Sequence, residues 1–456
     1  MVKIFKNITK SKEDKRDYRG LILDNELRVL LISDPKIDKA SAALSVNIGE
    51  LSDPQELSGL AHFLERVLFL GTKKYSDFLT EHDGDGISTT DMENTTYYFY
   101  VAHEHLTGAL DIFSQFPLAP LLDETKAKQI LDILLQINYD YEKLLRNDQW
   151  RLNQFERSIS KKNHPYNKFN HGNWQTLEND PKKNKIDLWK EMLNFHSNYY
   201  SPNIMSLVIL GKDSLDELQK KAENSFGKIE NKSVSLPEWP GHSVGDEQLC
   251  KAILAVPIED THKLEINFPI ADISRHYKGP YRYLSYLLNN KSSGSLLSAL
   301  KRSRWATNLE ATCKSVLRDI AYCFVEIYLT EMGLMNVHDV IDLFFQYINL
   351  LQETVNQNHE LTIYRDCLKN SYLNFHYREN EDSARDYCME LAENLLTEKW
   401  SRVKYVIRDI PKEMLDNWDF ADSNDELEFP QKNEFIPDSL DILRADDEKF
   451  YSISDC

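Results

Sequence analysis

The chain has 456 residues, of which 41% are hydrophobic and 28% charged, and its formal net charge at pH 7 is -19. This length and composition suit a soluble protein of roughly two to four domains with hydrophobic cores. The negative charge repels phosphate backbones and no Lys/Arg-rich block offsets it, so we expect no nucleic-acid partner.

The apolar runs of the sequence are too short for membrane targeting or insertion. The N-terminal residues lack the apolar core of a signal peptide, and no run approaches the ~20 residues that a membrane span needs. The six cysteines form no CxxC pair and none precedes Cys250, a distribution unlike a disulfide framework. We therefore expect a reducing, cytoplasmic location and no membrane partner.

The first half of the chain alternates strand and helix patterns. Two apolar runs at 27–33 and 42–49 flank the turn-rich sequence DPKIDKAS, which is typical of a β-hairpin. Further on, the pattern predicts a helix at about 58–70, a strand at 95–101, a helix from about 104, a long helix at about 124–157, a strand at 203–210 and a helix at 214–226.

A Pro- and Gly-rich stretch at 233–248 is the best linker candidate, and the same order of elements follows it. The second half predicts a strand at 264–269, a helix at 281–289, a strand at 320–329 and helices from about 335. We therefore expect an α+β fold of two similar αβ domains, residues 1–237 and 238–456.

Residues of chemical interest gather on two predicted helices. His62 and Arg66 are four residues apart and share a helix face, with Glu65 beside them. On the long helix, Asp140 falls on an apolar stripe made of Ile130, Ile133, Ile137 and Leu144. A carboxylate on a core-facing stripe needs a cation or a metal as partner. Taken alone, His62 is more typical of a core histidine than of a metal ligand.

Residues 58–75 closely resemble the active-site helix of insulin-degrading-enzyme-type peptidases, in the pitrilysin family of inverzincins. Similar blocks follow in order along nearly the whole chain, at 30–35, 51–54, 103–116, 147–156, 164–173, 195–203, 294–301 and 432–437. The resemblance implies two tandem pitrilysin-type domains, each a mixed, mainly antiparallel sheet backed by helices. Together they would form the N-terminal half of a clamshell.

The family motif is H-x-x-E-H followed by a distant Glu, in which two His and that Glu hold Zn²⁺ and the motif Glu is the general base. By resemblance, His62 and Asp140 lie at metal-ligand positions and Glu65 at the base. Arg66 stands where the second His is expected. A guanidinium has no free lone pair at neutral pH and repels Zn²⁺. Asp140 is also one methylene shorter than Glu.

From these departures we expect no bound zinc and lost or severely impaired peptidase activity. The Arg66 head group is expected to take roughly the place of the metal and to pair with Asp140, with Glu65 as a second candidate partner. The alternative is a weak zinc metalloendopeptidase acting on short peptides, in which His62 and Asp140 are joined by water or Glu142. A third reading is a non-functional gene product or splice fragment.

Other segments depart from the family in their contacts with substrate. Residues 86–90 fall where the family has a substrate-pairing edge strand, so the candidate substrate-binding residues are Ile87, Ser88, Thr89 and Thr90. Pairing with an added strand needs only backbone groups, so these residues form either a peptide-docking strand or an ordinary edge. Residues 310–313 replace a Gly-Gly segment of the docking exosite.

The second domain is expected to be internally shortened, because the chain skips a family stretch near 406–410. The leading function is therefore a degenerate peptidase homologue that binds peptides or a partner protein. A second copy or another protein could complete the clamshell as a homo- or heterodimer.

Overall fold

The computed structural model forms two compact units, which are described separately. The first comprises Met1–Asp260, Val316–Ile320 and Glu379–Tyr405, and the second Thr261–Ser315, Ala321–Arg378 and Val406–Cys456. The structure describes residues 2–397 except 7, 9, 12, 72, 119–126, 170, 240, 250, 260, 271–279, 318–319, 357–362, 364, 368, 371–372 and 375–382. The block at 432–437 and the shortened stretch near 406–410 lie outside the described residues.

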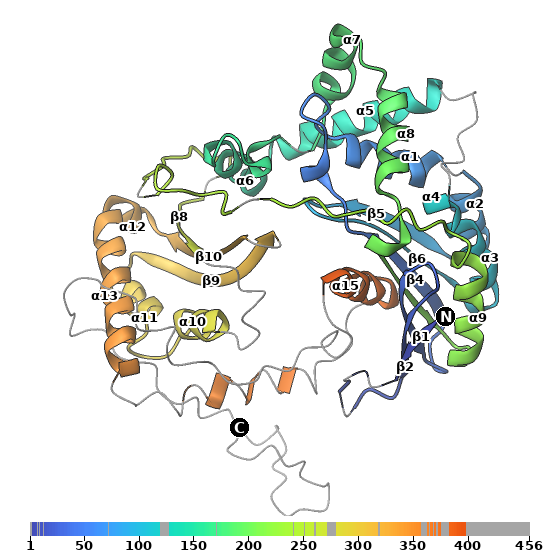
Figure 1. The fold of residues 1–456 in the computed structure, drawn as a ribbon. Helices are drawn as coiled ribbons and strands as arrows, with labels where there is room; N and C mark the ends of the chain where they lie inside the picture. The colour runs from blue at the N-terminus through green and yellow to red at the C-terminus, as the bar shows by residue number, and fades with distance from the viewer. Residues whose placement is uncertain are drawn as a thin grey trace, which may run out of the picture. The chain divides into compact units, whose positions relative to one another are not determined.

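A seven-stranded mixed sheet organises the first unit (Figure 1). Its strands are β1 (Lys3–Phe5), β2 (Asp17–Ile22), β3 (Arg28–Ser33), β4 (Lys39–Val46), β5 (Asp85–Thr90), β6 (Thr95–Ala102) and β7 (Met205–Gly211), in the spatial order β1-β2-β3-β7-β4-β6-β5. The β3–β7 pair is parallel and the other pairs are antiparallel. This confirms the predicted mixed, mainly antiparallel sheet.

The predicted hairpin between β3 and β4 is wrong, because β7 lies between them. Val208 of β7 pairs with Leu30 on one side and with Ala43 on the other. All seven residues of β7 are buried. Neighbouring strands are about 4.8 Å apart, so the short turn between β3 and β4 can reach across one inserted strand.

Helices pack on one face of this sheet, among them α1 (Leu60–Gly71), α2 (Lys73–Glu81), α3 (Leu106–Phe113) and α9 (Leu215–Phe226) (Figure 1). The first unit also contains α4 (Gln115–Leu118), α5 (Ala127–Leu144), α6 (Asp148–Ile159), α7 (Asp180–Asn184) and α8 (Leu188–Tyr199). Short turns of other helix types lie at Glu50–Ser52, His103–His105, Pro165–Asn167, Gln175–Asn179 and Pro202–Ile204. Phe63, Tyr97, Phe99 and Phe113 are fully buried in the core between helices and sheet.

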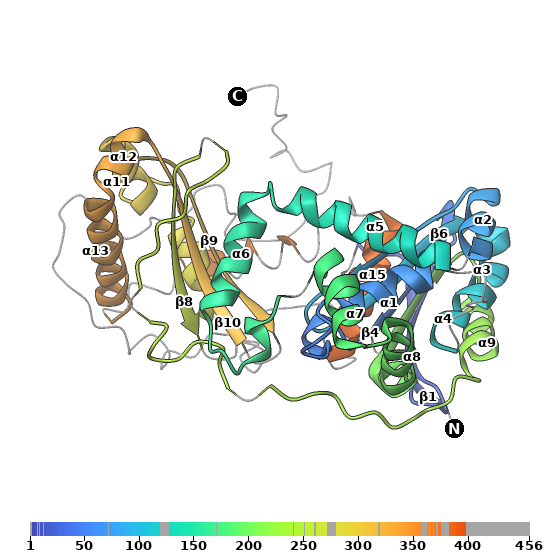
Figure 2. The same ribbon diagram turned by 90° about the horizontal axis from the view of Figure 1, so that it is seen from above.

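The single long helix predicted at about 124–157 is instead two helices, α5 and α6, which meet at an angle in Figure 2. The side chain of Asn147 accepts a hydrogen bond from the Trp150 amide at 2.8 Å and so caps the start of α6. A capping Asn satisfies a free amide at a helix start, which favours a new helix over continuation. The apolar stripe of α5 is buried at Ile133 and Ile137, while Asp140 is partly exposed.

The opposite face of the sheet is covered by α15 (Ala384–Thr397), a helix that lies far along the chain (Figure 1). Leu391 and Leu395 pack there against a buried cluster that includes Leu30, Ile32 and Val208. The sequence did not predict this packing. Both faces of the sheet are therefore apolar, which agrees with the nearly continuous burial of β3, β4 and β7.

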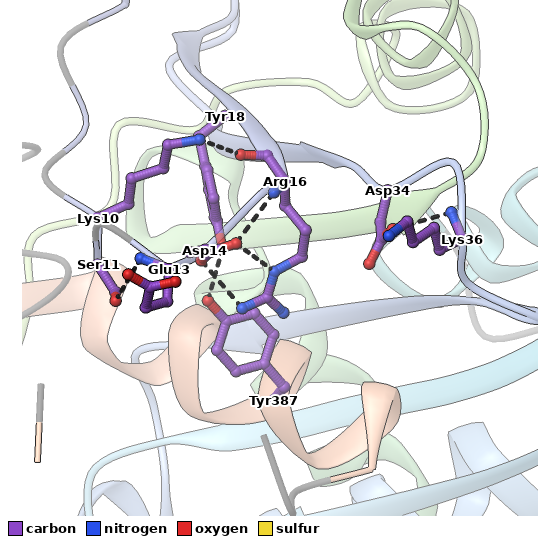
Figure 3. A network of polar contacts seen from close by, with 9 residues as sticks. All are labelled: Lys10, Ser11, Glu13, Asp14, Arg16, Tyr18, Asp34, Lys36 and Tyr387. Atoms are coloured by element: carbon purple, nitrogen blue, oxygen red, sulfur yellow. Dashed lines mark hydrogen bonds and ion pairs between the residues drawn. The ribbon is translucent and has the colours of Figure 1, made fainter. Parts of the chain in front are cut away.

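A polar network joins α15 to the segment that leads into β2 (Figure 3). The hydroxyls of Tyr18 and Tyr387 lie 2.9 Å apart, and Asp14 accepts hydrogen bonds from Tyr18 at 2.6 Å and from Arg16 at 2.8 Å. The Arg16 guanidinium also lies 4.5 Å from the ring centre of Tyr387. These contacts fix the start of α15 on the sheet.

Glu393 of α15 makes the stability of this contact depend on pH. Burial, followed by the charge of Asp91 and then that of Glu390, raises the pKa of Glu393 to about 7, although a hydrogen bond from Thr96 opposes the rise. The folded state thus binds its proton more tightly than the unfolded state, whose carboxyl has a pKa of about 4.5. This stabilising effect is complete below pH 4.5 and is lost as the pH rises to about 7.

Glu393→Gln is therefore expected to stabilise the chain at pH 8 by on the order of 2 kcal/mol and to flatten its stability between pH 5 and 7. The amide removes the buried charge and can still accept the hydrogen bond from Thr96. Urea unfolding at several pH values measures the effect. Glu81→Gln, at an exposed position of α2 whose charge is not among those acting on Glu393, is the control. An equal pH slope in the parent and in Glu393→Gln would contradict the prediction.

The second unit contains a three-stranded sheet in the order β8-β10-β9. Its elements are β8 (Lys263–Ile270), α10 (Pro280–Leu288), α11 (Leu296–Arg302), β9 (Ala306–Leu317), β10 (Ile320–Leu329), α12 (Glu331–Met335) and α13 (Val337–Asn356). The predicted strands at 264–269 and 320–329 and the helix at 281–289 are confirmed within a residue or two. β9, which holds the replaced segment 310–313, was not predicted.

A disulfide joins Cys313 of β9 to Cys323 of β10, which was not expected from the sequence. The two cysteines are ten residues apart in the chain, and only strand pairing brings them together. Among the described residues, no helix is both long and apolar enough to cross a membrane. The cytoplasmic location and the domain division at residues 237 and 238 stay predictions.

Candidate functional site

The candidate site is built on the first turns of α1, which a close backbone contact positions. Asp53 accepts hydrogen bonds from the amides of Gly59 at 2.7 Å and Ala61 at 2.8 Å, and so caps the helix start. Gly59 and Gly172 both have positive φ, at 94° and 77°. A Cβ on Gly59 would lie 2.3 Å from the Cα of Gly172. Two glycines therefore let the loop of residues 171–173 lie directly against α1.

His62 is buried between α1 and this loop. Its Nδ1 lies 2.9 Å from the backbone oxygen of His171. Because a carbonyl can only accept, Nδ1 carries the proton in this contact and Nε2 holds the lone pair. The Nε group of Arg66 donates to that Nε2 at 3.3 Å. The nitrogen that a metal would need is thus occupied by an N–H group of Arg66.

Arg66 also lies near two carboxylates. Its guanidinium is 3.8 Å from Asp140 and 3.7 Å from Glu65. The ion pair between Arg66 and Asp140 that the sequence predicts is therefore present. The side chains of Arg66 and Asp140 remain 30% and 27% exposed, so water screens their attraction in part. Asp140 also accepts a hydrogen bond from Gln136 at 3.0 Å.

Glu65 is only 1% exposed and is held by two hydroxyl groups of β5. Ser88 donates to one carboxylate oxygen at 2.6 Å and Thr90 to the other at 2.8 Å. Both residues belong to the edge strand that was predicted to bind substrate through its backbone, and that role stays a prediction. Their side chains point to α1, a contact that strand alternation allows but that sequence alone does not reveal.

The edge position of β5 is confirmed, since it is the last strand of the sheet and is paired with β6. Ile87 faces away from α1 and packs against the cluster beneath α15. Thr89 shares the face of Ile87 by strand alternation. In the described part of the chain no further strand pairs with β5, so its outer backbone edge can accept an added strand.

His171 belongs to this site but was not singled out in the sequence. Its ring centre lies 4.7 Å from that of His62. Burial, with the neighbouring His62, lowers the pKa of His171 to about 4, so its ring is neutral at pH 7. Its Nε2 is buried without a hydrogen-bond partner in the described part of the chain. The clue in the sequence was the adjacent Gly172, whose close contact with Gly59 places the loop.

The side chains present do not fit a tetrahedral zinc site. Such a site needs three protein ligands with free lone pairs on one side of the metal. Here the Nε2 lone pair of His62 faces Arg66. Arg66 itself, a cation, stands at the position where the family motif has its second His ligand. Among the residues that the structure describes, no group of three or more His, Cys, Asp or Glu side chains is arranged to hold a metal ion.

Comparison with known proteins places this geometry in a family context. Three family descriptions match successive parts of the chain. Residues 28–163 match "Insulinase (Peptidase family M16)", residues 190–365 match "Peptidase M16 inactive domain", and residues 389–453 match "Middle or third domain of peptidase_M16". The chain is 39% identical to the insulin-degrading enzyme of Homo sapiens, over 98% of this chain and 49% of that protein. It is 35% identical to the A-factor-processing enzyme of Saccharomyces cerevisiae, over 97% of this chain and 48% of that protein.

The fold is also similar to a solved structure. The crystal structure of pitrilysin matches with a TM-score of 0.83 and 27% identity, over 91% of this chain and 44% of that one. The chain thus spans about half the length of the relatives that it matches. This agreement of family descriptions, sequence identity and fold shows that the chain belongs to the M16 family of insulin-degrading-enzyme-like peptidases, with a pitrilysin-like fold.

Proposed function

We propose that this chain is a peptidase homologue that has lost zinc-dependent hydrolysis and that binds extended peptides or a partner protein. The observation that carries the proposal is the contact of Arg66 with Nε2 of His62 at 3.3 Å. A guanidinium at that place both fills the position of a ligand and opposes a divalent cation by its charge. Hydrolysis is lost because catalytic zinc needs three protein ligands with free lone pairs, and the Arg66 guanidinium supplies none.

The environment of Glu65 supports the same proposal. A general base needs access to the proton that it removes. The carboxylate oxygens of Glu65 accept hydrogen bonds from Ser88 and Thr90, and its side chain is buried. Glu65 then acts as a structural group that ties the edge strand β5 to α1. This role keeps β5 ordered without any bound metal.

The outer edge of β5 supports peptide binding. An extended peptide can add a strand to a free sheet edge through main-chain hydrogen bonds, with little demand on side-chain identity. The net charge of -19 favours a basic peptide by long-range attraction. A partner protein could use the same edge through an exposed strand. A dimer that completes a clamshell stays a prediction.

The test combines hydrolysis and hydrogen exchange on the full chain. With an unstructured basic peptide of ~10 residues, we expect no chelator-sensitive cleavage and an amide exchange in β5 that is slower by about 10-fold at saturation. Helix α9, which packs on β2 and β3 and not on β5, is the internal control and is expected to exchange unchanged. Cleavage that a chelator abolishes would favour the weak metallopeptidase instead. Unaltered exchange in β5 would overturn the binding proposal.

A further inference from the structure

Helix α15 presents a row of three side chains toward the edge of the sheet at β5. Arg385, Met389 and Glu393 recur every four residues, so they share one face of the helix. The Arg385 guanidinium lies 3.4 Å from the carboxylate of Asp85 on β5. At the other end of the row, Glu393 accepts a hydrogen bond from Thr96 of β6 at 3.1 Å. The row therefore runs along the last two strands of the sheet.

The row matches the spacing of the β5–β6 pair. Four residues of helix advance about 6 Å and two residues of strand about 6.6 Å, so each side chain of the row lies over one rung, meaning one pair of opposite residues. The rungs beneath α15 are Asp85 with Tyr100, Ile87 with Tyr98, and Thr89 with Thr96. Ile87 and Met389 both pack against the buried cluster that includes Tyr98, which places Met389 over the middle rung.

A peptide added to the outer edge of β5 continues these rungs, because opposite residues of paired strands point to the same face. The first rung offers no unpaired charge, since Arg385 already lies 3.4 Å from both Asp85 and Asp386. The middle rung offers the apolar side chains of Ile87 and Met389. A peptide residue opposite Ile87 is therefore expected to be apolar.

The third rung carries a carboxylate that lacks an opposite charge. The groups that face Glu393 are Asp91, at the end of β5, Glu390 on its own helix, and the Thr96 hydroxyl. In the part of the chain that the structure describes, no cation is among the groups acting on it. Neighbouring strands are about 4.8 Å apart, so a peptide residue opposite Thr89 lies roughly 10 Å from Thr96. A Lys or Arg side chain and Glu393 can together span that distance.

We propose that β5 and α15 together select peptides with a basic residue opposite Thr89 and an apolar residue opposite Ile87. The inference rests on the proposed addition of a peptide to β5 and names the class of peptide. Antiparallel pairing is slightly more stable per residue than parallel pairing, so the peptide runs antiparallel to β5. The basic residue then precedes the apolar one by two positions, as in Lys-x-Leu.

Binding of such a peptide depends on pH through Glu393. Only the ionised carboxylate attracts the basic residue, and the pKa of Glu393 is raised to about 7 by burial and by the charges of Asp91 and Glu390. The peptide therefore binds more tightly above pH 7 than below it, and we expect its Kd to rise about 4-fold between pH 8 and pH 6. A peptide with Gln in place of Lys should show little of this change.

Fluorescence anisotropy with labelled peptides of ~10 residues and the full chain tests the selection. At pH 8, Lys-x-Leu in a Ser/Thr background is expected to bind about 5-fold more tightly than Gln-x-Leu and than the reversed Leu-x-Lys. Glu393→Gln should remove the preference for Lys. Glu230→Gln, at an exposed residue that follows α9, removes one charge elsewhere and should keep it. Equal binding in the parent chain, tighter binding of the reversed peptide, or a preference that survives in Glu393→Gln would overturn the proposal.

Disulfide crosslinking tests the register. In a Cys250→Ser, Cys456→Ser background, Ile87→Cys is expected to crosslink with Lys-x-Cys in preference to Cys-x-Leu, because directly opposite Cα atoms are about 4.5–5.5 Å apart. Thr89→Cys is the matched control and should show the opposite preference. If every peptide leaves amide exchange in β5 unchanged, peptide binding at β5 fails. If exchange in β5 slows but binding and crosslinking ignore the peptide sequence, the selection alone fails.

Discussion

Arg66→His is expected to tighten zinc binding by about 100-fold or more relative to the parent chain. The substitution removes the cation, frees the Nε2 lone pair of His62 and adds a second imidazole on the same face of α1. Outer-shell changes alone alter metal affinity by about 10- to 100-fold, so a change of a direct ligand should do at least as much. Competition with a chromophoric chelator measures the affinity, and metal analysis after dialysis measures the stoichiometry.

Two variants separate the effect of the ligand from the effect of charge. Arg66→Ala removes the cation without adding a donor, so it should gain much less zinc affinity than Arg66→His. Asp140→Ala in the Arg66→His chain should remove most of the gain, because it deletes the third donor. If the parent chain binds one zinc per chain as tightly as Arg66→His, the guanidinium does not exclude the metal and the proposed loss of hydrolysis fails.

The second large effect is expected at the contact of α15 with the sheet. Leu391→Ala should destabilise the first unit by about 2–5 kcal/mol, because it removes a fully packed side chain and leaves a cavity. Leu391 is 3% exposed and packs in the cluster that includes Leu30, Ile32 and Val208. The midpoint of urea unfolding, with tryptophan fluorescence as the signal, measures the loss.

An exposed leucine on another helix provides the control for this loss. Leu135 of α5 is 50% exposed, so Leu135→Ala should change stability by no more than about 0.5 kcal/mol. Hydrogen exchange in β3 and β7 adds a local readout, since undocking of α15 would expose that face of the sheet. Equal losses from the two substitutions would mean that α15 does not stabilise the sheet.

Much of the local structure of this chain could be predicted from the sequence. The helix that carries His62, Glu65 and Arg66 and the helix at α9 follow from apolar periodicity, and the strand at β6 follows from its β-branched and aromatic residues. These are short-range properties. The structure adds a local reason for the start of α9, which is the capping box of Ser214 and Glu217. The proximity of Arg66 to Asp140 was also predicted, because the family resemblance assigns both residues to metal-ligand positions and a carboxylate on an apolar stripe needs a partner. The structure shows that pair, although Asp140 is partly exposed.

Other features were decided by contacts between distant parts of the chain. The insertion of β7 between β3 and β4 and the docking of α15 depend on which apolar surfaces meet, and many segments have suitable apolar surfaces. The binding of Glu65 by Ser88 and Thr90, and the approach of His171 to His62, require a strand edge and a glycine contact that join residues 23 to 109 positions apart. Sequence by itself determined the residue types on α1, and comparison with the family motif showed that Arg66 replaces a zinc-ligand His. Only the tertiary structure decided which groups surround them, because packing selects among partners that local patterns leave equivalent.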